Sequence, residues 1–265
     1  MNDGPRPEPV AVRPLALAGP GTPPFDLAAR LAEEHSWFPL HAPGARTRLV
    51  SPCLRMTLER GDRMIGTRRL NDALVLAARR SPGDRDQWWA AFSPQTPYEL
   101  TTAFVLGAAE LLATDPDSVM SERPGTAMSE LLPNADWTEE HGAHRTTIGS
   151  PGGETGVLHH PEQPWRPLIL SLVETTRDLA WSVTVAPQAP PALITAMATA
   201  LANGRALRRP DEIPADHAQR IRVESTQRKG KAARARSRRS APAPAAPPQS
   251  ADPRTQDPSR PRRSP

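Results

Sequence analysis

The sequence has a single cysteine, no long apolar run and little aromatic content. With Cys53 alone, the chain can form no internal disulfide, which is typical of a reducing compartment. No run of about 18 apolar residues occurs, so we expect no membrane span. The N-terminus MNDGPRPEPV lacks the basic and apolar regions of a secretory signal. These absences predict a cytoplasmic protein with no membrane partner.

Sequence patterns that would indicate catalysis or metal binding are also missing. Four histidines fall between residues 141 and 160, but no cysteine or HExxH spacing accompanies them, so solvated loop histidines are favoured over a metal site. Cys53 would need a histidine such as His35 or His41 beside it to act as a nucleophile. We therefore expect no catalytic residue, no metal and no cofactor. A non-enzymatic role is favoured, and an enzyme is left open.

Proline, in contrast, is abundant and concentrated at the ends. Of the 33 prolines, 15 lie in residues 1–24 and 241–265. Proline interrupts helices and sheet ladders. We therefore expect a disordered N-terminal segment over residues 1–23 and a disordered, Pro/Ala/Arg-rich basic tail over residues 210–265. The body of roughly 190 residues that remains is large enough for two small packed units.

An internal repeat organises this body. The segment WWAAFSPQTPYELTTAFVLGAAELL, residues 88–112, returns as WSVTVAPQAPPALITAMATAL, residues 181–201, at a constant offset of 93. A fixed offset of this kind predicts a repeated structural unit. We place the two units at residues 24–118 and 134–209, with a connector over residues 119–133.

Each copy is predicted to fold as a strand, a turn and a helix. In the first copy we place Thr96 as the N-cap, Pro97 as the first helical residue and Glu99 as the partner in a capping box. An apolar stripe with helical spacing follows. The residues expected to anchor the repeat are Trp88, Phe92, Thr96, Pro97, Glu99, Phe104, Trp181, Pro190 and Met197.

The features upstream of each copy follow the same order. A tryptophan, Trp37 or Trp137, precedes a Ser-Pro turn, an alternating strand and an apolar run. In the first copy that run is Leu70–Ala78, whose pattern fits a strand or a helix. We expect an α+β protein of two pseudo-repeated units, each an antiparallel sheet of three or four strands with a C-terminal amphipathic helix.

These residues resemble the SPDY family of actinobacteria, chiefly streptomycetes. The shared features are the aromatic residue before a Ser-Pro turn, the alternating strand, Trp-(x)-Ala-x-Phe, Thr-Pro-x-Glu and an Ala-rich helix. The resemblance covers Trp37–Leu112 closely and Trp137–Leu201, a degenerate second copy, loosely. The family's Ser-Pro-Asp is Ser51-Pro52-Cys53 here, and Ser150-Pro151-Gly152 in the second copy. Because SPDY is a domain of unknown function, often in two copies, the resemblance implies the architecture and no chemistry.

Charge is divided sharply along the chain. Residues 219–265 hold 13 Lys or Arg against three acidic residues, a net of +10, whereas the whole chain carries +4. A basic arm on an acidic body predicts non-specific contact with DNA or RNA. A protein partner, and an enzyme or small-ligand-binding cleft between the two copies, stay open as alternatives. The residues expected to contact nucleic acid are Arg228, Lys229, Lys231, Arg234, Arg236, Arg238 and Arg239.

Overall fold

The structure is a computed structural model of the 265-residue chain. It describes residues 8–13, 15–21, 27–41, 48–65, 68–120, 137–143, 145–150, 155–160, 167–173, 179–215 and 221–224. All of these belong to one unit, Met1–Ser225, which is separate from a second unit, Thr226–Pro265. The fold described below is that of the first unit.

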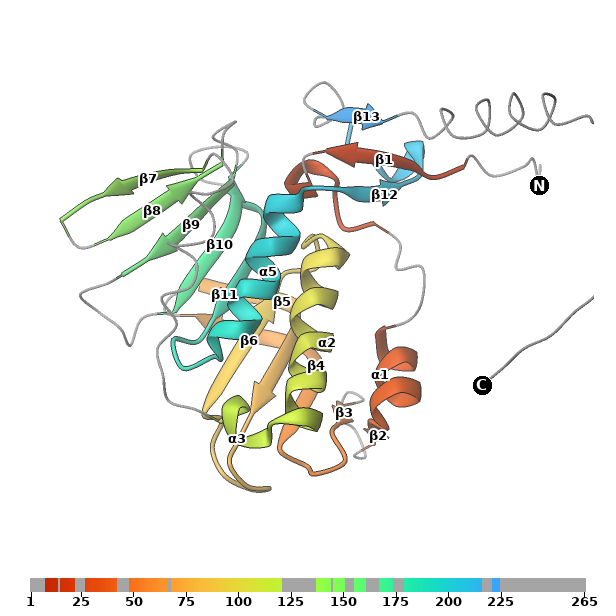
Figure 1. Ribbon diagram of the computed structural model, residues 1–265, viewed down its shortest axis with the longest axis vertical. Coiled ribbons are helices and arrows are strands. Elements are labelled where there is room, and N and C mark those ends of the chain that lie inside the picture. Colours follow the sequence, from red (N-terminus) through yellow and green to blue (C-terminus); the bar gives the residue numbers. More distant parts are fainter. Residues whose placement is uncertain are drawn as a thin grey trace, which may run out of the picture. The chain divides into compact units, whose positions relative to one another are not determined.

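Ten strands form one antiparallel sheet in the order β2-β3-β4-β5-β6-β11-β10-β9-β8-β7 (Figure 1). In chain order, strands β2 to β6 run from one edge of this sheet to its centre. Strands β7 to β11 then run from the other edge to the centre. The strands are β2 (Phe38–Leu40), β3 (Arg48–Val50), β4 (Met56–Ile65), β5 (Arg68–Ala78), β6 (Trp88–Phe92), β7 (Thr138–His141), β8 (Thr146–Gly149), β9 (Thr155–His159), β10 (Leu168–Val173) and β11 (Leu179–Val185).

Helices cover one face of this sheet. Helix α2 (Tyr98–Thr114) follows β6 and helix α5 (Pro191–Asn203) follows β11, and the two pack side by side (Figure 1). Helix α1 (Leu27–His35) packs beside α2. The short helix α3 (Pro116–Val119) follows directly after α2 in the chain. The main core lies between the sheet and these helices because the helices and the inner strands of the sheet turn apolar faces toward one another. The α+β class predicted from the sequence is confirmed.

The arrangement of strands differs from the prediction in one respect. Three or four strands were expected in a separate sheet for each copy, but each half contributes five strands to one continuous sheet. The predicted strand at the start of each copy is confirmed by β6 and β11, and the undecided run Leu70–Ala78 is strand. The halves join through β6 and β11, because each is the last strand of its own half and has a backbone edge left to pair.

The join between β6 and β11 follows the repeat. Ala91 lies opposite Thr184, its counterpart at the offset of 93. The amide of Ser93 donates to the carbonyl of Ser182 at 2.9 Å, and the corresponding amide of Ala186 donates to the carbonyl of Trp89 at 2.8 Å. Each hydrogen bond is therefore the counterpart of the other.

The predicted capping box is wrong. Helix α2 begins at Tyr98, with Pro97 as N-cap and no hydrogen bond from a capping side chain. The Thr96 hydroxyl donates instead to the carbonyl of Ser182 at 3.2 Å, across the join between the halves. Glu99 binds Arg208 rather than the start of its own helix. The tertiary partners offered by the second half outcompete the local cap.

The N-terminal boundary also needs correction. Residues 10–18 were expected to be disordered, but they form β1 (Val10–Arg13) and the 3-10 helix η1 (Leu15–Leu17), and most of them are buried. Strand β1 pairs with β12 (Ala206–Arg208) and with β13 (Arg222–Glu224) in a second sheet. The 3-10 helix η3 (Pro210–Glu212) follows β12. The ordered body thus extends beyond residue 210, where the tail was predicted to begin.

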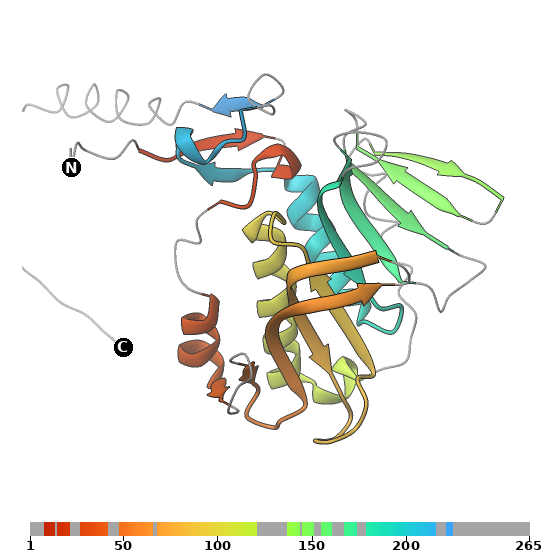
Figure 2. The same cartoon turned by 180° about the vertical axis from the view of Figure 1, so that it is seen from behind.

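The β4–β5 hairpin is long and bent. Its register shifts between Gly61 and Arg63, and Asp72, on the partner strand at this point, has a φ of 50°, the left-handed conformation seen at β-bulges. Figure 2 shows the hairpin, in orange, turning across the back of the sheet. A small second apolar cluster, Leu70, Ala73, Val75 and Ala91 with Trp89 against it, lies on the sheet face opposite the helices.

Candidate functional site

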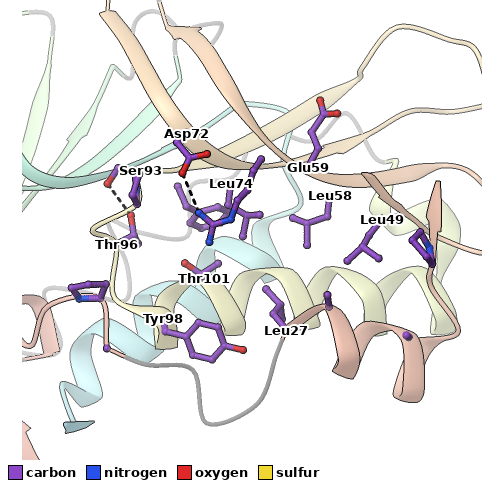
Figure 3. Close-up of a pocket in the computed structure, with 18 residues that line it drawn as sticks. Leu27, Leu49, Leu58, Glu59, Asp72, Leu74, Ser93, Thr96, Tyr98 and Thr101 are labelled. Atoms are coloured by element: carbon purple, nitrogen blue, oxygen red, sulfur yellow. Dashed lines mark hydrogen bonds and ion pairs between the residues drawn. The ribbon is translucent and has the colours of Figure 1, made fainter. Parts of the chain in front are cut away.

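A pocket of about 840 Å³ lies in the first half of the fold, between the helix-covered face of the sheet and helix α1 (Figure 3). Its apolar walls come from five strands and two helices: Pro39 of β2, Leu49 of β3, Leu58 of β4, Leu74 of β5, Phe92 of β6, Tyr98 of α2 and Leu27 of α1. Pockets of roughly 300–1,000 Å³ with mainly apolar walls are typical of small-ligand sites.

Strand register explains why these side chains meet. Leu49 pairs with Leu58, and Leu74 pairs with both Arg60 and Phe92. Side chains directly opposite one another on antiparallel strands share a face of the sheet. Since successive side chains alternate between faces, Leu58 and Arg60 also lie on the same face of β4. The sequence therefore places one charged group on an otherwise apolar surface.

The polar end of the pocket is formed by Arg60 and Asp72. Nη1 of Arg60 lies 3.5 Å from Oδ2 of Asp72, and the two side chains are 62% and 58% exposed. The side chain of Glu59, between Leu58 and Arg60, points away from the pocket, and Nε of Arg48 donates to its carboxylate at 2.7 Å. Figure 3 shows Leu27, Leu49 and Leu58 gathered toward one end and Asp72 toward the other.

Two hydroxyls beside the pocket have structural tasks. Oγ of Ser93 accepts a hydrogen bond from the amide of Ser182 at 2.9 Å, and the Thr96 hydroxyl donates to the carbonyl of that residue. At the offset of 93 these two positions are Ala186 and Ala189 in the second half. The polar lining therefore belongs to the first half, where it also strengthens the join to β11.

A buried arginine, Arg208, joins three segments of the chain next to the pocket, and we call this arrangement the arginine clasp. Arg208, which is 2% exposed, donates from Nη1 and Nη2 to the two carboxylate oxygens of Glu99 at 2.6 and 2.7 Å. Its Nε and Nη2 also donate to the carbonyls of Ala18 and Gly19, both at 3.0 Å. A buried guanidinium is tolerated when its donors are satisfied in this way. Sequence reasoning missed the clasp because 109 residues separate Glu99 from Arg208.

The predicted anchors of the repeat lie in the core. Trp88, Phe92, Phe104, Trp181 and Met197 are all buried. Phe104 packs edge-on against both Trp88 and Phe92, with ring centroids 6.2 and 5.6 Å apart. The indole of Trp88 donates to the carbonyl of Val119, and that of Trp181 to the carbonyl of Ala16. Pro190, like Pro97, is the N-cap of its helix.

The remaining candidates form no site in the described part of the chain. The seven basic residues between Arg228 and Arg239 fall outside the described residues. Cys53 is exposed, with its sulfur 3.6 Å from Oγ of Ser51. His141 is exposed and hydrogen-bonds Thr146 through Nδ1 at 3.2 Å. No group of three or more metal-ligating side chains comes together among the residues described.

The resolved pKa shifts lie away from the pocket. Hydrogen bonds from the side chain and amide of Ser118 lower the pKa of Asp115, which caps α3. The hydrogen bond from Arg30 lowers the pKa of Glu34 on the surface of α1 and raises that of the arginine. None of these groups lines the pocket.

Comparison with protein-family models, with curated proteins and with solved structures finds no match to this chain. Within the described residues, no helix combines the length and the apolar character needed to span a bilayer. The pocket, the arginine clasp and the charge pattern are therefore the observations on which a function can be proposed.

Proposed function

We propose that the chain is a non-enzymatic binding protein whose basic tail contacts nucleic acid without base preference. The observation that carries this proposal is the run of seven Lys or Arg between Arg228 and Arg239 with no acidic residue among them. Such a run binds phosphates by displacing condensed counterions. No aromatic residue lies in residues 219–265 to stack on bases, so affinity depends on charge alone. We also propose that the body is a divergent tandem copy of the SPDY type.

The experiment compares the full chain with a chain that ends after Ser225. This end point keeps Arg222–Glu224, which pairs with β1, and removes only the second unit. If about five to seven phosphates are neutralised, log K for duplex DNA should fall with log salt at a slope of roughly −4 to −6. The shortened chain should lose this binding. Sequence-selective binding by the shortened chain would assign recognition to the folded body instead.

A second candidate function is small-ligand binding by the folded body. The specific observation that favours it is the pocket of about 840 Å³ with apolar walls and a charged end. The pocket lies within the first half, rather than between the two copies where the sequence analysis placed its alternative site. Binding of the neutral fluorescent probe N-phenyl-1-naphthylamine tests this candidate. Ala28→Trp, which adds a ring at a half-buried lining position on α1, should abolish probe binding.

A further inference from the structure

The charged end of the pocket defines a class of ligand. We propose that the pocket binds an amphipathic anion, with its apolar body against Leu27, Leu49, Leu58 and Leu74 and its carboxylate or other oxyanion on Arg60. This inference rests on the small-ligand function proposed above and adds the chemistry of the ligand to it.

The apolar part of the ligand follows from the walls. Leu58 and Leu74 stand on neighbouring strands, Leu49 extends the same surface to β3, and Leu27 faces them from α1 (Figure 3). These side chains can exclude water from an aliphatic or ring-containing body, and burial of apolar area supplies most of the binding energy in such sites. The charged end then sets orientation and specificity.

The sign of the ligand's charge follows from how the ionic groups are engaged. The carboxylate of Glu59 lies on the opposite face of β4 and accepts a hydrogen bond from Arg48 at 2.7 Å. Arg60 contacts Asp72 through one nitrogen at 3.5 Å, and it makes no hydrogen bond to any other described residue. A guanidinium has five donors arranged to match an oxyanion. Arg60 therefore has donors to offer a ligand, whereas the carboxylate of Glu59 points away from the pocket.

Asp72 gives the arginine its position. Its backbone is in the left-handed conformation, and its amide donates to Oδ1 of Asp62 at 3.1 Å, so the bend of the hairpin fixes this carboxylate beside Arg60. An incoming oxyanion competes with Asp72 for Arg60. Since both side chains are more than half exposed, this competition is weak and the exchange costs little.

The test uses the full chain and two probes that differ only in head group. Dodecanoate and dodecan-1-ol, both below micelle-forming concentrations, are titrated against bound N-phenyl-1-naphthylamine, and the displacement constants are compared. Dodecanoate should bind several-fold more tightly than the alcohol. Arg60→Gln should reduce this preference about three- to tenfold, because one exposed charge-assisted contact is lost. Asp72→Asn should increase the preference.

Arg85→Gln is the matched control. Arg85 is exposed in the loop between β5 and β6 and does not line the pocket. This variant should leave the preference unchanged, which separates a site effect from general attraction of anions by the basic chain. An equal loss in Arg85→Gln and Arg60→Gln, or no loss in either, would overturn the proposal for an anion. Failure of the naphthylamine probe to bind, or its indifference to Ala28→Trp, would instead overturn the small-ligand function itself.

Discussion

Arg208 connects parts of the chain that are remote in sequence. Its guanidinium joins β12 to the first turn of α2 and to the carbonyls of Ala18 and Gly19. Because the side chain is buried, each lost hydrogen bond would leave an unsatisfied polar group in the core. The guanidinium of Arg208 also leaves no room for a side chain at Gly21.

Gly21→Ala should destabilise the fold by about 2–4 kcal/mol. Gly21 has a φ of +70°, which is unfavourable for alanine, and an added Cβ would lie 2.6 Å from Nε of Arg208. Gly83→Ala is the matched control, since Gly83 has a φ of +93° with no heavy atom within 4 Å of the added Cβ. Urea denaturation should show a larger loss for Gly21→Ala. Equal losses of stability would mean that backbone strain alone causes the destabilisation. The Arg208 side chain would then move aside without a further loss of stability.

At the scale of the element, the two helices that follow β6 and β11 show what the repeat preserves. Pro97 and Pro190 are both N-caps with nearly the same backbone angles, φ −52° and ψ 129° against φ −55° and ψ 132°. The Ser-Pro turns also correspond: the amide of Met56 donates to Oγ of Ser51 at 3.0 Å, and that of Thr155 to Oγ of Ser150 at 3.1 Å. Local backbone geometry is kept even where side chains differ.

Gly107→Ala tests the packing of α2 on α5. Gly107 lies inside α2, and its counterpart at the offset of 93 is Ala200. An added Cβ would sit 3.5 Å from Cδ2 of Leu193, an ordinary van der Waals distance. Replacing a glycine within a helix by alanine should therefore stabilise the protein by up to about 1 kcal/mol. Thermal denaturation measures the change; a lower midpoint would indicate that the helices pack more closely than this contact allows.

Local pattern predicted the elements well but missed the long-range contacts. The alternation of side chains in Trp88–Phe92 identified β6, and the apolar stripe after Pro97 identified α2. Both patterns repeat with the period of the element that they form, two residues for a strand and about 3.6 for a helix. The pattern of Val10–Arg13 is too short to distinguish a strand from an irregular Pro-rich segment. Its partners, Ala206–Arg208 and Arg222–Glu224, lie about 200 residues away. The pocket was missed for the same reason, since its walls come from elements between Leu27 and Thr101.

For the whole folded unit, the continuous sheet makes the two halves dependent on each other. Strand β6 has β5 on one side and β11 on the other, and α2 packs against α5. Removing the second half would expose a strand edge with buried apolar residues such as Ala90 and Phe92. Unpaired edges of this kind associate with other chains. The halves are thus related in sequence but share one core.

A fragment of residues 27–120 should therefore not be a stable monomer. Ala91 lies opposite its own counterpart, Thr184, so two copies of the fragment could pair through β6 in the same register, Ala91 opposite Ala91. We expect a dimer or larger species by sedimentation velocity, with folded secondary structure increasing with fragment concentration. The full chain serves as the control, since β11 occupies that edge in it. A folded fragment that stays monomeric at all concentrations would show that the first half is stable without β11. That result would contradict the inference that the two halves depend on each other.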